Sequence, residues 1–369
     1  MHTPRDKRVY QKEALSLASA GFKVVHLCPG PLSFSGLHDG VNTITYAIPK
    51  GLLGRIKQLL FLFKNARSIN ADAYHCNEVD SWILGIILRI FYKKKCIFDV
   101  HEHYPSTFSQ SRFPLIFQPF ISSFIKFIFI LLGPFTDKFV LAKKSVSNDF
   151  KVSSDKKILV RNYASLSAFS KIDCKTTTDL SRNSTFRLIH LGLFSKKRGW
   201  PQILESLSLM KNKNLEFTAI GEINDGSLPD FLKMVKDLGL SNRVHFLDWM
   251  PYDEVLDYLM DSDIGIIAFQ PHILNHVYAM PHKMFDYMVS SLAVILPNFA
   301  EEVSPIIEEE NCGILVDTSS PLEISSALDE LLDNPAKLRA MGSNGVEAIK
   351  KSYNWESESQ KLIEMYRSL

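Results

Sequence analysis

The chain has 369 residues, of which 42 are Lys or Arg, 40 are Asp or Glu and 46% are hydrophobic. This composition excludes a disordered or fibrous protein, and the length exceeds what one hydrophobic core usually supports, so about two domains are expected. Charge is divided unevenly, because residues 1–165 hold 23 basic and 11 acidic side chains whereas residues 166–369 hold 19 and 29. The basic first half favours an anionic partner, such as a membrane surface or a phosphate-bearing substrate; a solvated surface without a partner is the alternative.

Short apolar runs alternate with longer segments of helical period, which is typical of an α/β fold. Strands are predicted at Phe22–Cys28, Asp72–Cys76, Lys95–Val100, Lys138–Ala142 and Lys157–Val160, and then at Phe186–Leu191, Leu215–Gly221, Arg243–Leu247, Ile264–Phe269, Ala293–Leu296 and Gly313–Val316. Helices are predicted at Val9–Ala20, Pro201–Met210, Leu228–Leu238, Tyr252–Met260, Pro281–Ser290 and Leu322–Leu332. Two Rossmann-like domains are therefore expected, in residues 1–165 and 185–352, with the polar, aperiodic residues 166–184 as the linker.

Two segments of the first half have the pattern of membrane-contacting helices. In Leu52–Arg67, apolar residues recur at three- and four-residue steps and every charge is positive, as in a helix that lies in an anionic interface. Leu115–Leu132 is strongly apolar, but it contains Pro119 and Lys126, so we expect a buried or interfacial helix and not a transmembrane one. Ordinary core helices with a solvated basic face are the alternative for both segments.

The cysteines and the first residues indicate the compartment. The five cysteines are scattered and form no Cys-x-x-Cys pair, which argues against a disulfide framework or a structural zinc and fits a reducing cytoplasm. Residues 1–8 are polar and no apolar core region follows, so no signal peptide is expected. No nucleic-acid recognition motif is present, and nucleic acid is not an expected partner.

A first candidate ligand site is the loop within His190–Gly199, which follows a predicted strand. Open α/β sheets bind ligands at the carboxyl ends of their strands. Gly192 would allow close approach of a ligand to the backbone, and the consecutive cations Lys196, Lys197 and Arg198 could neutralise a diphosphate. A solvated basic turn is the alternative.

A second candidate site lies within Ala279–Met288. Pro281 fits the first position of a helix, so backbone N–H groups and the positive end of the helix dipole would face an anion. Lys283 falls in the first turn, where a cation opposes the dipole unless it meets a bound anion. Asp286 could accept two hydrogen bonds from a ribose diol, or it could be a surface acid that interacts with the dipole.

These motifs occur in a fixed order with others. The remaining members of the series are Phe217–Gly221, Leu240–Phe246, Ser262–Gly265 and Cys312–Val316. This series resembles the nucleotide-sugar half of GT-B glycosyltransferases of family 4. Asp99–Pro105 and Arg161–Tyr163 in the first half, and Asn354–Glu356 before the last helix, agree with the same resemblance. Asp99–Pro105 resembles the Asp-Val-His-Glu-x-Tyr-Pro signature of a bacterial polysaccharide-biosynthesis subset of that family.

The resemblance implies two facing Rossmann-like domains with an interdomain cleft and a last helix, in residues 353–369, that crosses back to the first domain. It implies a retaining, metal-independent transfer of a sugar from a nucleoside-diphosphate sugar, without a further cofactor, to a lipid-linked or growing glycan. Such a glycan would belong to a cell-surface polysaccharide such as lipopolysaccharide or capsule. The protein would be cytoplasmic, with a peripheral position on the inner face of the cytoplasmic membrane as a further expectation.

The resemblance also implies roles for single residues. Arg198 and Lys283 would stabilise the leaving diphosphate, and Asp286 would hold the ribose. His101 and Glu102 would line the reacting sugar and the acceptor side. The implied catalytic residues are thus His101, Glu102, Arg198 and Lys283, and the implied donor-binding residues are Gly192, Lys197, Arg198, Gly221, Pro281, His282, Lys283 and Asp286.

Three departures from the family pattern leave alternatives open. Leu193 replaces a usual arginine, which Lys196 or Lys197 would have to substitute, and Tyr278 replaces a usual acid, which Asn275, His276 or His272 would have to substitute. Family members also have a β-strand before the first helix, so either that strand is missing here, which would destabilise the first domain, or the true start of the chain lies upstream of Met1. The alternatives are a catalytically degenerate binding or scaffold subunit, and a nucleotide-sugar epimerase or a phosphorylase on the same fold.

Overall fold

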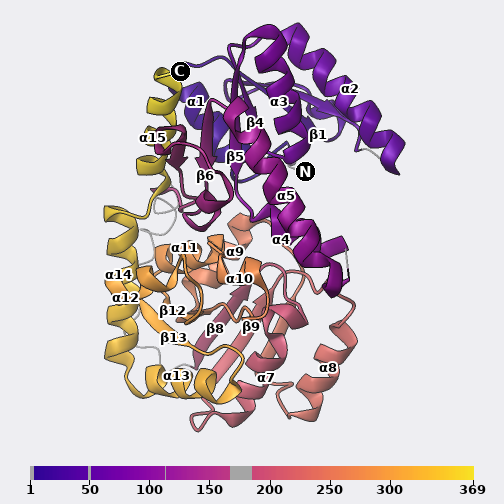
Figure 1. Ribbon diagram of the computed structural model, residues 1–369. Coiled ribbons are helices and arrows are strands. Elements are labelled where there is room, and N and C mark those ends of the chain that lie inside the picture. Colours follow the sequence, from indigo (N-terminus) through magenta and orange to yellow (C-terminus); the bar gives the residue numbers. More distant parts are fainter. Residues whose placement is uncertain (1–3, 49–50, 113, 167–184) are drawn as a thin grey trace. The chain divides into compact units, whose positions relative to one another are not determined.

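The computed structural model describes residues 4–48, 51–112, 114–166 and 185–369 and divides the chain into two compact units (Figure 1). The first unit contains residues 1–162 together with Trp355–Leu369, and the second contains Tyr163–Asn354. Nearly all of the linker predicted at residues 166–184 lies outside the described residues.

The first unit contains two sheets. One has the strand order β1-β3-β2 and the other has the order β4-β5-β6-β7, and every pair is parallel except β2 with β3. The elements are η1 (Val9–Ala14), α1 (Leu15–Ser19), β1 (Val24–Pro29), η2 (Leu32–Phe34), β2 (Gly36–His38), β3 (Val41–Tyr46), α2 (Gly51–Ile69), β4 (Ala73–Cys76), α3 (Val79–Tyr92), β5 (Lys95–Val100), α4 (Tyr104–Arg112), η3 (Leu115–Phe117), α5 (Gln118–Leu132), η4 (Gly133–Phe135), β6 (Lys138–Leu141), η5 (Ser145–Asp149), η6 (Ser154–Lys156), β7 (Lys157–Leu159) and α15 (Trp355–Arg367).

The five strands predicted in the first half are confirmed, but β2 and β3 were missed. The inward-facing residues of β3 are Val41, Thr43 and Thr45, so two of its three buried positions are polar and the apolar signal is weak. No strand precedes η1 in residues 4–8, and β1 and β4 form no strand pair with each other in the described part of the chain.

An aromatic cluster fills one side of the four-stranded sheet. Trp82 of α3 is fully buried, and its ring stacks on Phe98 of β5 with centroids 4.4 Å apart and planes at 3°. Phe129 of α5 and Phe150 meet the Trp82 ring edge-on. The indole nitrogen donates to Oγ1 of Thr136 at 2.8 Å, so the only polar atom of the indole has a partner.

The last helix packs on the other side of this sheet. Trp355, Leu362, Ile363 and Met365 of α15 are buried in a cluster with Ile97, Val140 and Val160 of the sheet and its margins. In addition, Nε1 of Trp355 donates to Oγ of Ser16 at 2.9 Å.

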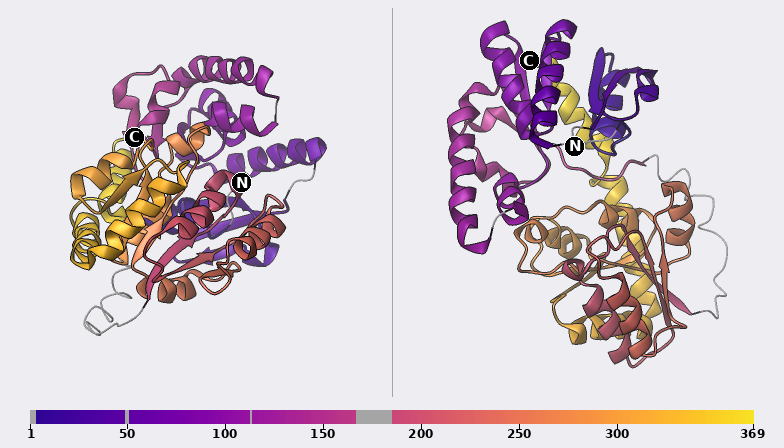
Figure 2. Two further views of the ribbon diagram at one scale, coloured as in Figure 1. Left: turned by 90° about the horizontal axis from the view of Figure 1, so that it is seen from below. Right: turned by 90° about the vertical axis from the view of Figure 1, so that its right-hand side faces the viewer.

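The apolar segment predicted at Leu115–Leu132 is η3 followed by α5. Of the two expected placements, buried or interfacial, burial does not hold for most of its length, because Phe120, Phe124, Phe127 and Leu131 are 73%, 60%, 61% and 58% exposed. Residues Gln118–Phe135 are long and apolar enough to cross a membrane by length and composition, and 11% of them are buried. In the right-hand view of Figure 2, α4 and α5 lie along the outer edge of the first unit.

The second unit has one parallel sheet of order β10-β9-β8-β11-β12-β13, with helices packed on both faces (Figures 1 and 2). Its elements are β8 (Phe186–Leu191), η8 (Lys196–Arg198), α7 (Trp200–Leu209), β9 (Leu215–Ile220), α8 (Leu228–Asp237), β10 (Val244–Leu247), α9 (Tyr252–Met260), β11 (Ile264–Ile266), α10 (Leu274–Val277), α11 (His282–Val289), β12 (Ala293–Pro297), α12 (Ser304–Glu310), β13 (Gly313–Val316), α13 (Pro321–Asp333) and α14 (Pro335–Lys351). Every strand predicted for this half is confirmed, most within one residue at each end.

One boundary needs correction. Pro281 is extended, with φ −74° and ψ 128°, and α11 begins at His282. Pro281 is therefore the residue before the helix and not its first residue, which moves Lys283 to the second helical position.

Candidate active site

The candidate donor site lies at the switch point of the second sheet. From β8 the chain moves outward through β9 and β10, and it then returns to the other side of β8 to form β11, β12 and β13. In open parallel sheets this reversal separates the loops after two neighbouring strands and opens a crevice for ligands at their carboxyl ends. Here the crevice is flanked by the loops after β8 and β11.

Two glycines at this edge of the sheet leave the backbone uncovered by side chains. Gly192, which follows β8, has a φ of +83° and donates its N–H to the carbonyl oxygen of Ile220 at 2.7 Å. A Cβ on Gly221, which follows β9, would lie 2.1 Å from the carbonyl oxygen of Gly192. The two predicted donor-binding glycines are therefore in backbone contact, and this contact excludes a side chain at position 221.

Lys283 is held against the end of β8 by His190. Its Nζ lies 3.1 Å from Nε2 of His190, a fully buried ring whose Nδ1 is 3.2 Å from the carbonyl oxygen of Ile266. A neutral imidazole carries one ring hydrogen, and each ring nitrogen faces a carbonyl, because Nε2 also lies 3.3 Å from the carbonyl oxygen of Leu193. With the hydrogen on Nδ1, Nε2 accepts from Nζ of Lys283. Burial, followed by the charge of Lys283, holds the pKa of His190 well below its usual value, so this ring is neutral.

Lys283 and Arg198 form a cationic pair beside Gly192. A Cβ built on Gly192 would lie 3.9 Å from Nζ of Lys283. Burial lowers the pKa of Lys283 well below its usual value, and the charge of Arg198 lowers it further. The guanidinium of Arg198 lies 5.3 Å from the ring centroid of Phe269, which follows β11. A bound anion would favour the charged form of Lys283 beside Arg198, so this edge of the sheet is suited to a diphosphate.

The three consecutive cations of η8 do not point to one place. Lys196 forms an exposed ion pair with Asp230 of α8, and Lys197 is exposed. Only Arg198 is partly buried and directed at the loop after β11. The expectation that the whole run neutralises one diphosphate is therefore not met by this arrangement, and Lys196 is not placed to substitute for the arginine that Leu193 replaces.

Asp286 has a partner that the sequence did not reveal. Its Oδ1 accepts a hydrogen bond from the hydroxyl of Tyr252, at the start of α9, at 2.8 Å. Burial, together with the charge of Asp286, raises the pKa of Tyr252, so the phenol stays protonated and donates. This bond orients the carboxylate that was predicted to hold a ribose. His282 precedes Lys283 as the first residue of α11.

The proposed substitutes for the acid at Tyr278 are differently placed. His276 is buried, its ring stacks on Phe269 with centroids 4.4 Å apart, and its Nδ1 accepts from the backbone N–H of Gln270 at 3.2 Å. Burial and the charge of Arg198 lower the pKa of His276 to about 4, so the ring is neutral at pH 7. His276 therefore supports the aromatic platform of Arg198. His272 is exposed, and Asn275 and Tyr278 are half-buried.

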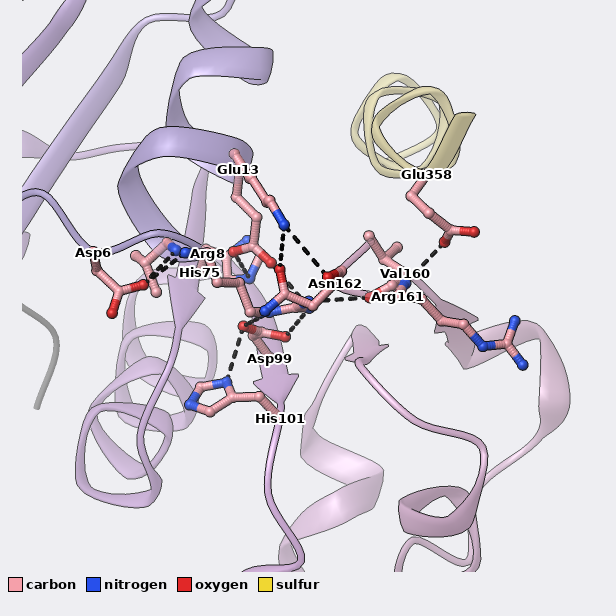
Figure 3. Close-up of polar contacts among 12 residues, drawn as sticks. Asp6, Arg8, Glu13, His75, Asp99, His101, Val160, Arg161, Asn162 and Glu358 are labelled. Carbon is pink, nitrogen blue, oxygen red and sulfur yellow. Dashed lines mark hydrogen bonds and ion pairs between the residues drawn. The ribbon is translucent and has the colours of Figure 1, made fainter. Parts of the chain in front are cut away.

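His101 and Glu102 belong to the first unit, directly after β5. Nδ1 of His101 lies 3.2 Å from Oδ2 of Asp99, whereas Glu102 is exposed. Figure 3 draws the contact between His101 and Asp99. Asp99 is recognisable in the sequence as a charged residue within the apolar run Cys96–Val100, whereas no local pattern marks its partner Arg8.

One group of potential metal ligands is already neutralised by a protein cation. Glu13, His75 and Asp99 each offer a ligand atom within 4.8 Å of the others. However, Nη2 of Arg8 lies 2.8 Å from Asp99 Oδ1 and 3.0 Å from Glu13 Oε1, where a metal ion would have to compete with it. The residues present fit an arginine cluster better than a metal site.

Comparison with known sequences shows that the second unit is similar to glycosyltransferases. A family model described as glycosyl transferases group 1 matches residues 179–348. The MMP alpha-(1->4)-mannosyltransferase of Mycolicibacterium hassiacum is 28% identical over 136 residues, which are 36% of this chain and 31% of that protein. The lipopolysaccharide core biosynthesis glycosyltransferase LpsD of Rhizobium meliloti is 21% identical over 198 residues, which are 53% of this chain and 52% of LpsD. The match thus covers about a third of the length of the first relative and about half of the second.

Structural similarity extends over almost the whole chain. Alr3699/HepE of Anabaena, in complex with UDP, has a TM-score of 0.72 at 13% identity and covers 94% of this chain and 100% of its own. Solved structures with this degree of similarity have the GT-B architecture of two Rossmann-like domains. The predicted fold class is therefore confirmed, and the chain has the GT-B fold.

Proposed function

We propose that the chain is a glycosyltransferase that moves a sugar from a nucleoside-diphosphate sugar to a glycan acceptor, with retention of configuration and without a metal. The observation that carries this proposal is the cationic pair Lys283 and Arg198 beside the Gly192 and Gly221 backbones, at the switch point of a GT-B sheet. The similar fold of Alr3699/HepE, whose structure contains UDP, supports a nucleotide donor.

The chemistry follows from where charge develops. Cleavage of the bond between the sugar and the diphosphate leaves negative charge on the departing phosphate, so fixed cations stabilise the transition state more than the ground state. Lys283, oriented by His190, and Arg198, oriented by Phe269, are the cations that this site supplies. Asp286, oriented by Tyr252, is the group proposed to bind the ribose. His101 and Glu102 are proposed to face the reacting sugar and the acceptor.

For the acceptor, we propose a lipid-linked or growing glycan of a cell-surface polysaccharide, at the cytoplasmic face of the membrane. The similarity to LpsD supports this class, as does the sequence resemblance of Asp99–Pro105. Two exposed surfaces of the first unit also support contact with an anionic membrane. The face of α5 carries exposed Phe and Leu side chains, and α2 exposes both apolar side chains and the cations Arg55, Lys57, Lys64 and Arg67.

The membrane part is tested by sedimentation with vesicles of phosphatidylglycerol and phosphatidylcholine at low salt. Wild-type protein should bind, and the triple variant Phe120→Ser, Phe124→Ser and Phe127→Ser should bind several-fold less. Leu232→Ser, which removes an exposed leucine on α8 of the second unit, is the matched control and should bind as wild type. Failure of the wild-type protein to bind would refute membrane contact and leave the donor proposal standing.

The donor part is tested by a thermal-shift panel of nucleoside diphosphates and their sugars on the full chain. A ligand that binds only the folded state raises the melting temperature. One nucleotide should stabilise the wild type and lose its effect in Lys283→Ala, whereas Lys233→Ala, an exposed lysine on α8, should keep it. No shift with any nucleotide in folded protein would overturn the proposal.

Leu193 and Tyr278 favour one second candidate, a donor-binding subunit without turnover. This candidate predicts a thermal shift without sugar transfer or donor hydrolysis. An epimerase would convert the donor without an acceptor, and a phosphorylase would require free phosphate, so product analysis distinguishes all of them.

A further inference from the structure

The first unit contains a buried arginine that is paired in two ways with one carboxylate. Nε of Arg8 donates to Oδ2 of Asp99 at 3.0 Å, and Nη2 donates to Oδ1 at 2.8 Å. Nη1 donates to the carbonyl oxygen of Val160 at 3.1 Å. Arg8 is 5% exposed and Asp99 is fully buried, so this pair is isolated from water (Figure 3). A bidentate arginine fixes both the position and the plane of the carboxylate.

The backbone at Arg8 is fixed as well. Oδ1 of Asp6 accepts from the N–H groups of both Arg8 and Val9 at 2.9 Å, at the point where η1 begins. Arg8 therefore enters the cluster from a capped helix start, and its guanidinium cannot move without breaking that cap or the pair with Asp99.

Asp99 also holds His101. Its Oδ2, which accepts from Arg8, lies 3.2 Å from Nδ1 of His101. Burial alone would raise the pKa of Asp99, but the charge of Arg8 and the hydrogen bonds from His101 and Arg8 hold it well below its usual range. An ionised carboxylate only accepts, so Nδ1 of His101 carries a hydrogen, and Nε2 is the nitrogen that Asp99 does not hold.

The other titratable groups around Arg8 do not compete with Asp99 for the positive charge of the guanidinium. Oε1 of Glu13 lies 3.0 Å from Nη2 of Arg8, but burial and the charge of Asp99 raise the pKa of Glu13 well above its usual value. Nε2 of His75 lies 3.7 Å from Oε2 of Glu13, and burial lowers the pKa of His75 to about 4. Burial thus favours the uncharged forms of Glu13 and His75, and the charge of Arg8 is paired directly with Asp99.

We propose that Arg8 and Asp99 are positioning residues for His101, which fix its ring in the Nδ1–H tautomer and direct Nε2 to accept a hydrogen bond from a hydroxyl of the bound sugar or acceptor. This inference rests on the proposed function, in which His101 contacts the reacting groups. It assigns a catalytic purpose to a buried ion pair, which by itself contributes little net stability because both charges must be desolvated.

Asp99→Asn is the primary test, because an amide has the shape of the carboxylate but presents an N–H to one of its partners. In wild-type protein, the ¹⁵N spectrum should show Nδ1 of His101 protonated and Nε2 unprotonated. In Asp99→Asn the amide cannot accept from Arg8 and His101 at both of its terminal atoms, so the fraction of His101 in the Nδ1–H tautomer should fall. The value of kcat should then fall roughly 100-fold, within the range for loss of an oriented acid–base group, while the donor KM changes little.

A double-mutant cycle separates positioning from general structural damage. If Asp99 acts through His101, the variant Asp99→Asn/His101→Ala should be no slower than His101→Ala alone. Additive losses, or an unchanged kcat in Asp99→Asn, would overturn the proposal. Asp149→Asn is the matched control, because Asp149 is also buried and lies 3.3 Å from Nε2 of a different histidine, His103. It should leave kcat and the His101 signals unchanged.

Two further measurements keep the proposal testable if a variant does not fold. Arg8→Lys retains the buried positive charge without the two parallel hydrogen bonds, and it should lower kcat less than Asp99→Asn does. The ¹⁵N spectrum of the wild-type protein is by itself a test of the proposal. A His101 ring that is protonated at Nε2 and unprotonated at Nδ1 would contradict it. A third outcome is also decisive: the protein shows the expected His101 tautomer but neither transfers sugar nor binds nucleotide. That result would refute the proposed function and the catalytic role of His101, but it would confirm that Asp99 positions the ring.

Discussion

The hydroxyl of Tyr366, on the last helix of the chain, lies 2.8 Å from Nδ1 of His75 on β4. Their rings are also nearly parallel, at 21° with centroids 6.0 Å apart. A neutral His75 accepts from the phenol, and its other nitrogen faces Glu13, so α15 is connected to the polar cluster around Arg8. The last helix is therefore part of the interior of the first unit.

Tyr366→Phe should destabilise the first unit by about 1–3 kcal/mol, because it removes the phenol and leaves a buried nitrogen of His75 without that partner. Urea unfolding followed by tryptophan fluorescence measures this change. Tyr258→Phe, which alters a tyrosine of α9 that is 40% exposed, is the control and should change the midpoint little. Equal urea midpoints for the two variants would show that the hydrogen bond between Tyr366 and His75 does not contribute to stability.

Stability should fall as the pH is lowered from about 6.5 to 4, in part because of His75. Burial lowers the pKa of His75 to about 4, whereas in the unfolded chain it is about 6.5, so between these values the unfolded state binds more protons. This one group contributes a slope of at most about 1.4 kcal/mol per pH unit. The slope should be smaller in His75→Gln, and equal slopes for the two proteins would show that His75 is protonated in the folded state.

Lys283→Ala should weaken binding of the nucleoside diphosphate by about 10- to 100-fold, the range expected for loss of a charge-assisted hydrogen bond of about 1.5–3 kcal/mol. His190→Ala should weaken it less, because Lys283 keeps its charge but loses the acceptor that orients it. Calorimetric titration with the nucleotide selected by the thermal-shift panel measures both values. Tighter binding in either variant would show that the cationic pair does not hold the anion.

Asp286→Asn should mainly raise the donor KM, because it weakens the proposed ribose contact without altering the cations. Tyr252→Phe should raise the KM by a smaller factor, since it removes only the bond that orients the carboxylate. A large fall in kcat with an unchanged KM in Asp286→Asn would assign this residue to the chemical step instead.

Gly221→Ala should disrupt the donor site, because the added Cβ would lie 2.1 Å from the carbonyl oxygen of Gly192 and would push the two loops apart. Gly226→Ala is a close control, because Gly226 also has a positive φ, of +76°, but nothing lies within 4 Å of the added atom. The control should lose about 1 kcal/mol of stability or slightly more from backbone strain and still bind nucleotide. Equal nucleotide affinity in both variants would contradict the loop contact.

Much of the second unit could be predicted from the sequence because its strands are continuous apolar runs bounded by glycine or polar residues. The same reasoning placed Gly192 at the carboxyl edge of a parallel sheet, since it follows a predicted strand directly, whereas Gly221 was assigned to the donor site by the family resemblance. It failed for β3, where buried Thr43 and Thr45 conceal the period of two. It also overestimated the η8 loop, because Lys196 forms a surface ion pair with Asp230 whereas Arg198 lies over the ring of Phe269.

The residues that orient the site could not be predicted in the same way. Tyr252 is 34 residues from Asp286 and Arg8 is 91 residues from Asp99, and no local pattern encodes such contacts. Asp99 alone carries a signal, because a carboxylate within the buried run Cys96–Val100 requires a buried partner. The search for that partner has to consider every cation in the chain, and the three-dimensional arrangement identifies it as Arg8.

The separation of the first unit into two sheets affects which part of the chain unfolds first. In its described residues, no ladder of backbone hydrogen bonds joins β1 to β4, so the three-stranded sheet is connected to the larger one by side-chain packing and by the covalent chain. We expect such a sheet to unfold locally as a small cooperative unit. Its free energy of local unfolding should be lower than that of the six-stranded sheet of the second unit. Amide protons of β1, β2 and β3 should therefore exchange with solvent before those of β8 and β9, at denaturant concentrations that leave the nucleotide-binding half intact.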